Sequence, residues 1–199
     1  MNDFAPTGDD RPEGSGDPPD PPGPPDRARW AVAAGVVLAL TVVTLRLLGR
    51  PWWCELGDLL PGTLQAEGRH TSQHLLDPYT FTHVLHGVVF YGLLWAALRE
   101  RAGLAGRALL ALVLESGWEV LENTNWIIER YRTAALAHDY FGDAVLNSLA
   151  DVAACMGGFA LAWRLPVRAS IAVYVAVELA LLATIGDGLT LNVVHLLGG

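Results

Sequence analysis

Long apolar runs separated by polar connectors make up most of this chain. Five runs are long enough to cross a bilayer of about 30 Å at a helical rise of about 1.5 Å per residue. They cover residues 30–48, 80–98, 104–122, 143–163 and 169–185. The pattern therefore predicts an all-α fold, a polytopic helical membrane bundle of about five transmembrane helices.

Two shorter segments complete the pattern. Residues 126–132 combine Trp and Ile with Arg and Tyr, which predicts a short amphipathic helix at the membrane interface. Residues 189–197 follow the breaker Gly186-Asp187-Gly188 and are too few to cross the bilayer unaided. This last segment is expected to be either a terminal cap or a re-entrant piece.

The N-terminal segment has a different composition. Eight of the twelve prolines lie in the first 26 residues, together with Asp9, Asp10, Asp17 and Asp20. Such a segment buries too little apolar surface to offset the entropy of ordering it. We expect residues 1–28 to be a disordered cytoplasmic tail and residues 29–199 to be a helical transmembrane domain.

Composition narrows the class of protein. The mean hydropathy of +0.31, with 52% apolar and 17% charged residues, is too apolar for an ordinary soluble domain. The net charge of -8 argues against nucleic-acid binding, so the expected partner is the lipid bilayer. Cys54 and Cys155 fall at different predicted depths, so no disulfide is expected, and neither belongs to a thiolate motif with zinc spacing.

Arginine placement predicts the orientation, because lysine is absent and cytoplasmic connectors accumulate basic residues. From residue 27 onward, a cytoplasmic N-terminus leaves seven arginines inside and five outside. The inside set is Arg27, Arg29, Arg99, Arg101, Arg107, Arg164 and Arg168, and the outside set is Arg46, Arg50, Arg69, Arg130 and Arg132. The inner connectors are also the short ones, which favours the same orientation.

Three of the apolar runs carry polar side chains at helical spacing. The sets are His83 and His86; Glu115, Glu119 and Glu122; and Asp143, Asn147 and Asp151. Spacings of three, four and seven place each set on one face of its helix. Charges inside hydrocarbon cost about 2.5 to 3.5 kcal/mol each even on a lenient scale, so they normally face a bundle interior and mark a site.

Helical rise predicts the depth of each residue in that site. The deepest layer, about 9 to 12 Å below the outer boundary, is expected to contain His86, Glu115 and Asp151. A second layer, about 5 Å below the boundary, contains His83, Glu119 and Asn147. Glu122, Asn123 and Asp143 lie at the mouth. Three helices would thus supply three layers of one polar cleft.

Five carboxylates in one small site cannot all stay ionised. A divalent metal, shared protons, Arg46 and Arg130, or imidazolium forms of the two histidines would each neutralise them. Mixed histidine and carboxylate ligands suit zinc, iron or manganese better than calcium. The outer loop adds His70 and His74, an H-x3-H pair that either contributes ligands or gates the site.

Structural roles compete with these assignments. Asp143 follows Gly142 at a helix start, so a helix N-cap is as good an interpretation as a ligand. Asn147 and Ser148 suit interhelical hydrogen bonding. Close helix packing explains Cys155, Gly157 and Gly158. Glu178 faces either the same cavity or a partner subunit, and His195 is expected to be an interfacial residue without chemistry.

Four motifs carry a family resemblance. They are S-x-H-L-L-D-P-Y-T-F-T-H-V-L-H-G-V-V-F-Y-G-L-L-W, then E-S-G-W-E-V-L-E-N with I-I-E-R-Y-R, and D-Y-F-G-D-A-V-L-N-S-L-A-D. The region 49–192 resembles an uncharacterised family of bacterial multi-pass inner-membrane proteins. The resemblance implies an inner-membrane location and no particular activity. The chain also resembles, more faintly, VanZ-like membrane proteins, which have a histidine-bearing span, an acidic span and a D-x3-N helix. The corresponding residues here are His86, Glu115, and Asp143 with Asn147.

Three function classes remain. The first is an intramembrane enzyme acting on a lipid or lipid-linked substrate at the outer leaflet. In that enzyme, a divalent transition metal such as zinc is held by His83, His86, Glu115 and Asp151, with Glu119 as general base. The further catalytic candidates are Glu122, Arg130 and Asn147. The second class is a carrier or proton-coupled translocator, and the third is a structural or assembly protein. Substrate, metal and oligomeric state stay open.

Overall fold

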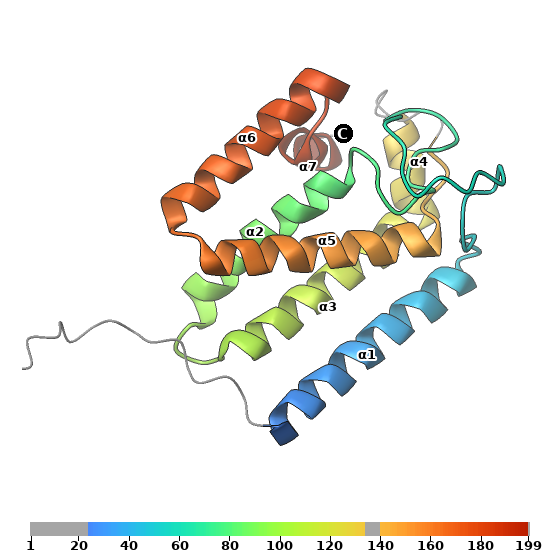
Figure 1. The fold of residues 1–199 in the computed structure, drawn as a ribbon. Coiled ribbons are helices and arrows are strands. Elements are labelled where there is room, and N and C mark those ends of the chain that lie inside the picture. The colour runs from blue at the N-terminus through green and yellow to red at the C-terminus, as the bar shows by residue number, and fades with distance from the viewer. Residues whose placement is uncertain (1–23, 134–139, 199) are drawn as a thin grey trace, which may run out of the picture.

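Seven helices and no strand make up the described part of the protein, a computed structural model that describes residues 24–133 and 140–198 (Figure 1). The helices are α1 (Pro24–Leu47), α2 (Thr80–Leu98), α3 (Leu104–Glu122), α4 (Asn125–Thr133), α5 (Val145–Arg164), α6 (Val167–Ile185) and α7 (Leu189–Gly198). The predicted all-α helical bundle is confirmed. Residues 1–23 of the predicted tail lie outside the described residues.

The helix ends agree closely with the pattern of apolar runs. Helices α2 and α3 have the predicted bounds, and α4 is the predicted amphipathic helix. Helix α1 begins at Pro24, so residues 24–28, which were assigned to the tail, are helical. Helix α5 begins at Val145, and the predicted terminal segment is the helix α7.

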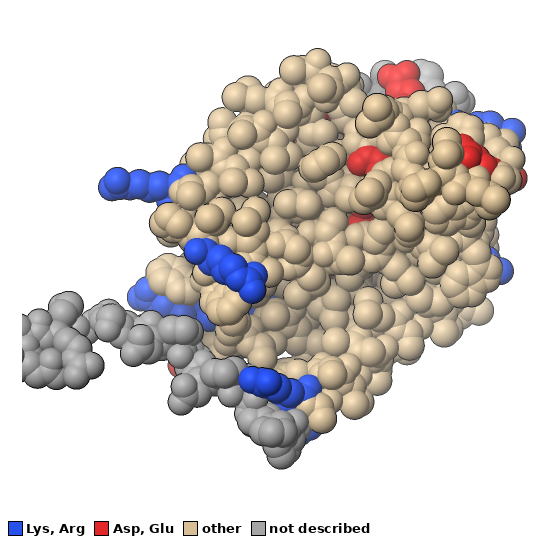
Figure 2. Space-filling view, viewed as in Figure 1, with Lys and Arg blue, Asp and Glu red and all other residues tan. Residues whose placement is uncertain are grey.

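Four helices, α1, α2, α5 and α6, are long and apolar enough to cross a membrane. Helix α3 has the same length as α2, but it carries Arg107, Glu115, Glu119 and Glu122. In Figure 2 arginines gather at the end of the molecule where the α2–α3 and α5–α6 connectors lie, and acidic side chains lie toward the opposite end. Between them a broad band of this face carries few charged side chains, as expected of a lipid-facing surface.

Helices α2 and α5 form the most extensive helix pair, and two glycines allow their close approach. A Cβ atom at Gly87 would lie 1.9 Å from the carbonyl oxygen of Cys155, and one at Gly158 would lie 2.0 Å from that of Val84. At Gly157 a Cβ atom meets nothing within 4 Å. Close packing therefore explains Gly158 as predicted, whereas Gly157 has open space beside it.

Loop backbone covers the start of α5. The first turn of a helix leaves N–H groups without intrahelical partners. Here Ala144 N donates to Ser72 O at 2.9 Å and Val145 N donates to Pro51 O at 2.8 Å. The long α1–α2 loop, residues 48–79, is thereby fixed over the end of the α2/α5 pair.

Glu178 holds α7 against α6. Its carboxylate accepts hydrogen bonds from the backbone N–H groups of Leu189 at 2.8 Å and Thr190 at 3.2 Å, at the N-terminus of α7. A negative charge at that end also interacts favourably with the helix dipole. Glu178 therefore caps α7, a role that the sequence did not predict.

Candidate functional site

Glu115 lies between two histidines at the centre of the polar cluster. His83 Nδ1 is 2.6 Å from Glu115 Oε1, and His86 Nδ1 is 3.0 Å from Glu115 Oε2. Glu115 is fully buried, and His83 is 6% exposed. The polar faces of α2 and α3, which the sequence placed only on separate helices, therefore meet.

His83 brings the third helix into the same cluster. Its Nδ1 atom lies 3.3 Å from Glu119 Oε1, and its Nε2 atom lies 3.9 Å from Asp151 Oδ2 on α5. The depth estimate put His83 one layer above Glu115 and Asp151. In the structure the His83 ring contacts both residues, because side chains from neighbouring layers of packed helices reach one another.

Several buried oxygens of this cluster have no hydrogen-bond partner among the described residues. They include both carboxylate oxygens of Glu119 and Oδ1 of Asp151. An unpaired buried carboxylate oxygen is costly unless a proton or a cation accompanies it. The cluster contains two groups of possible metal ligands, and within each group the ligand atoms lie within 4.8 Å of one another. The groups are His83, His86 and Glu115, and His83, Glu119 and Glu122.

Asp143 joins an adjacent hydrogen-bonded layer. It accepts hydrogen bonds from Asn123 Nδ2 at 2.6 Å and from the Tyr140 hydroxyl at 2.9 Å. Its own backbone N–H donates to Asn123 Oδ1 at 2.8 Å. The N-cap position of α5 is occupied by Ala144, without a side-chain cap. The N-cap interpretation of Asp143 is therefore wrong, because its carboxylate is taken up by these two side chains.

Burial and neighbouring charges shift the ionisation of this layer. Burial raises the pKa of Asp143 above its usual value. The hydrogen bonds from Tyr140 and Asn123 oppose this shift but do not cancel it. Burial and the Asp143 charge raise the pKa of Tyr140 well above its ordinary value. Burial, the charges of Glu122 and Asp143 and a hydrogen bond to Glu122 raise the pKa of Tyr131. Both phenols therefore act as donors to carboxylates.

Two residues that the sequence assigned to the site or to its charge balance, Asn147 and Arg46, make contacts outside the cluster. Asn147 Nδ2 donates to His74 O at 2.7 Å, so its amide holds the α1–α2 loop. Arg46 donates to Arg50 O and lies 5.3 Å from the ring centroid of Trp52, away from the carboxylates it was expected to neutralise. Arg130 lies on α4. The catalytic roles of Asn147 and Arg130 stay predictions.

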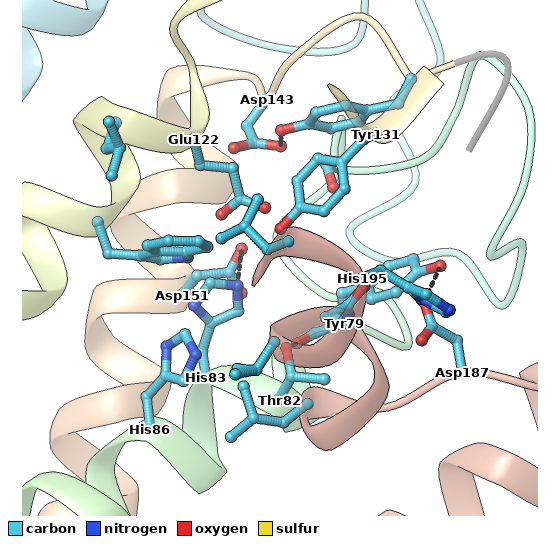
Figure 3. Close-up of a pocket in the computed structure, with 18 of the residues that line it drawn as sticks. Tyr79, Thr82, His83, His86, Glu122, Tyr131, Asp143, Asp151, Asp187 and His195 are labelled. Carbon is cyan, nitrogen blue, oxygen red and sulfur yellow. Dashed lines mark hydrogen bonds and ion pairs between the residues drawn. The ribbon is translucent and has the colours of Figure 1, made fainter. Parts of the chain in front are cut away.

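A cavity of about 500 Å³ opens beside the cluster (Figure 3). His83, His86, Glu122, Asp143 and Asp151 line one part of it. The apolar remainder comes from α2, α3 and α7. Its side chains are Val89, Phe90, Leu114, Leu121, Leu189, Val193 and Leu196. The cavity therefore combines an acidic, histidine-containing end with an apolar wall.

The sequence missed several side chains that line this cavity. Tyr79, Tyr131, Asp187 and His195 all line it, and His195 was expected to have no part in a site. Figure 3 places Tyr79, Asp187 and His195 together on the side of α7. The Tyr79 hydroxyl donates to Asp187 Oδ2 at 3.4 Å. These residues lie in loops, at helix ends or on α7, where helical spacing gives no signal.

Asp77 is a further missed residue next to the pocket. Its carboxylate accepts hydrogen bonds from the backbone N–H groups of Tyr79 at 2.8 Å, Thr80 at 3.1 Å and Ser72 at 3.0 Å. It therefore caps the first turn of α2 and fixes Ser72, whose φ of 57° is in the left-handed region. An Asp before the first apolar residue of a helix is the signal that could have found it.

Residues 45–198 match the family model described as Protein of unknown function (DUF2585). The chain belongs to this family. The match includes α2 to α7 and therefore every residue of the polar cluster. It confirms the resemblance to an uncharacterised bacterial family. The similarity to VanZ-like proteins is not shown by these matches.

Bacterial relatives are similar over most of the chain. The UPF0314 protein of Rhizobium meliloti (strain 1021) is 46% identical over 171 residues, 85% of each chain. That of Sinorhizobium fredii (strain NBRC 101917 / NGR234) is 44% identical over 169 residues, 84% of each chain. That of Paracoccus denitrificans (strain Pd 1222) is 42% identical over 168 residues, 84% of this chain and 86% of the relative. No solved structure matches the chain.

Proposed function

We propose that this protein is a metal-dependent enzyme of the bacterial inner membrane that acts on a lipid or lipid-linked substrate. The observation that carries the proposal is the cavity of about 500 Å³, in which histidines and carboxylates adjoin an apolar wall. An amphiphile suits such a cavity, because its acyl chain would contact the apolar wall and its polar group would reach the cluster. The α1, α2, α5 and α6 helices would cross the bilayer with the N-terminus in the cytoplasm.

The unpaired carboxylate oxygens support a cation in the cluster. His83, His86 and Glu115, with Asp151 facing His83, are the ligands we assign to a divalent transition metal such as zinc. The 2.6 Å between His83 Nδ1 and Glu115 Oε1 is the length of a hydrogen bond, so a proton now occupies that contact. A bound metal would displace this proton, and binding should therefore weaken as the pH falls.

The remaining residues have distinct roles in the proposed hydrolysis. A bound metal would supply an activated water. Glu119, whose carboxylate oxygens accept no hydrogen bond among the described residues, would accept a proton from that water as the water oxygen attacks the substrate. Glu122, next to the Tyr131 hydroxyl, would return a proton to the leaving oxygen. Asn147 is a positioning residue that holds the loop over the cavity.

Metal analysis of the purified protein tests this proposal. We expect wild type and His195→Ala to retain a transition metal in the membrane cluster, and His86→Ala to lose it. His195 is the matched control because it lines the same cavity outside both ligand sets. Equal metal content in wild type and His86→Ala would overturn the metal assignment.

A second measurement tests the chemistry. Wild type and Glu119→Gln are incubated with a bacterial lipid extract, and the lipids are analysed by mass spectrometry. We expect one lipid class to decrease with time only with wild type and only with metal present. A lipid that stays bound to the protein without chemical change would instead favour the carrier function.

A further inference from the structure

A second cluster of possible metal ligands lies outside the membrane helices, in the α1–α2 loop. Residues 48–79 form neither helix nor strand, and their one backbone bridge joins Gly62 and Leu76. Ordered loops of this length are uncommon in compact domains and need interactions that hold them. The cluster in this loop consists of Cys54, Asp58, His70 and His74.

The distances within the loop cluster are those of atoms that share one ion. Cys54 Sγ lies 3.6 Å from His70 Nδ1, and His70 Nδ1 lies 3.3 Å from His74 Nε2. Tetrahedral zinc, with bonds of about 2.3 Å to sulfur and about 2.05 Å to nitrogen, sets about 3.5 Å between S and N and about 3.3 Å between two N atoms. Both distances agree with this geometry to about 0.1 Å.

Asp58 completes a set of four ligands. Its Oδ2 atom lies 3.9 Å from His70 Nδ1 and 4.0 Å from His74 Nε2. A tetrahedral site requires about 3.4 Å between these atoms, so Asp58 must approach by about half an ångström. Its side chain is 30% exposed, and its other carboxylate oxygen, Oδ1, accepts a hydrogen bond from the backbone N–H of Leu60 at 2.9 Å. The Trp53 indole, which donates to Asp58 O at 2.6 Å, already holds its backbone beside the cluster.

His74 is oriented as a metal ligand usually is. Its Nδ1 atom lies 2.7 Å from Leu60 O, an acceptor, so Nδ1 carries the proton. The Nε2 lone pair then faces His70 and Asp58. Histidines that bind zinc typically donate their other ring N–H to a carbonyl or carboxylate in this way. His74 is fully buried, and its ring packs edge-on to Trp53 at 5.8 Å.

We propose that Cys54, Asp58, His70 and His74 bind one zinc ion with a structural role. The ion is separate from the one assigned to the membrane cluster, and the proposal does not depend on the function of that cluster. Four protein ligands close the coordination sphere, as in structural zinc sites. The ion would join the start of the loop at Cys54 to its end at His74.

The zinc site would hold the rim of the cavity. His74 O accepts the Asn147 amide at 2.7 Å, and the neighbouring Gln73 side chain donates to Gly142 O at 2.8 Å. Thr71 and Ser72 line the cavity. Because residues 71–73 lie between His70 and His74, an ion bound to both histidines would keep this part of the rim in place.

Cobalt substitution of the full-length protein in detergent tests the site. Cobalt bound to a thiolate absorbs in the near ultraviolet, which reports cysteine ligation directly. We expect wild type to bind one cobalt ion with this absorption, and Cys54→Ser to lack it. Cys155→Ser, the matched control at the other cysteine, should keep it, and so should His86→Ala in the membrane cluster.

The other possible results of the cobalt experiment would contradict the proposed zinc site. Absence of the absorption in wild type, or its persistence in Cys54→Ser, would show that Cys54 binds no metal. Loss in Cys155→Ser with persistence in Cys54→Ser would place the ion beside α5.

Tryptic cleavage after the exposed Arg69 gives an independent readout of the loop. We expect a chelator to accelerate this cleavage in wild type and added zinc to reverse it. In His70→Ala cleavage should be fast with or without zinc. A wild-type cleavage rate that is indifferent to chelator and zinc would overturn the structural role.

Discussion

At the residue scale, His83 is the side chain that couples the three helices. It faces Glu115, Glu119 and Asp151, while His86 is a second histidine beside Glu115. A buried group with several charged neighbours titrates together with them rather than alone. Changes at one carboxylate should therefore alter the protonation of His83 and, through it, the other two.

The first prediction concerns this coupling. Glu115→Gln removes the partner of both imidazoles, so it should lower the free energy of unfolding by about 3 kcal/mol. Asp151→Asn should cost less, because its 3.9 Å contact with His83 is longer. The double variant should lower the free energy of unfolding by about 1 to 3 kcal/mol less than the sum of the two single variants. The reason is that both carboxylates interact with the same imidazole, that of His83.

Thermal or denaturant unfolding in detergent measures these changes. Glu178→Gln is the control, because that carboxylate caps α7 away from the cluster and its cost should add independently to either single change. Strict additivity between Glu115 and Asp151 would show that His83 does not connect them.

Tyr140 provides a pH-dependent prediction. Tyr140→Phe removes the hydroxyl that donates to Asp143 Oδ1 at 2.9 Å, so at pH 7 it should cost about 1.5 to 3 kcal/mol. The pKa of Tyr140 is raised in the folded protein, so its stabilising contribution is complete below the unfolded value of about 10 and is lost as pH rises further.

The difference between wild type and Tyr140→Phe should therefore shrink above about pH 10. Unfolding midpoints at pH 7, 9 and 11 measure it. Tyr174→Phe is the comparison, because the Tyr174 hydroxyl contacts Thr190 in an exposed position. A Tyr140→Phe cost that stays constant from pH 7 to 11 would contradict the raised pKa.

At the element scale, backbone contact between α2 and α5 sets the position of the cluster. The same pair of helices carries His83, His86 and Asp151, and Gly87 and Gly158 let their backbones touch. Small residues at crossing points allow such approach between membrane helices. Separation of the two helices would lengthen the contact between His83 and Asp151.

Gly158→Ala should separate the pair and lower stability by about 1 to 3 kcal/mol, because its Cβ atom would collide with Val84 O. Gly157→Ala is a matched control one residue away, with nothing within 4 Å of the added atom. It should be neutral or stabilise by up to about 1 kcal/mol, since alanine favours the helix. Unfolding midpoints compare the two, and equal effects would disprove the close approach.

At the scale of the whole molecule, periodicity predicted the helices well and their rotation poorly. Bounds for α2 and α3 follow from apolar runs alone, since a run has the same length whatever it packs against. Which side chains of facing helices meet depends on crossing geometry, so helical spacing could not predict that His83 contacts Glu115, Glu119 and Asp151 together. The contacts of Cys54 with His70 and of Glu178 with Leu189 join loops and helix ends, for which helical spacing carries no information.

The last prediction concerns how the molecule sits in the membrane. From residue 27 onward, seven arginines against five predict that the α2–α3 connector is cytoplasmic and that the α1–α2 loop lies outside. In a Cys54→Ser, Cys155→Ser background, a membrane-impermeant thiol reagent should label Leu64→Cys in intact cells, because Leu64 is 94% exposed in that loop. Gly103→Cys, between α2 and α3, should react only after permeabilisation.

Val175→Cys provides the control for the bilayer itself. Val175 is 48% exposed near the middle of α6, so the reagent would reach it in a water-soluble protein. In a membrane the surrounding hydrocarbon excludes a charged reagent, and we expect no labelling even after permeabilisation. Reversed labelling of Leu64→Cys and Gly103→Cys would move the cavity to the cytoplasmic leaflet. Labelling of Val175→Cys in native membranes would show that α6 does not span.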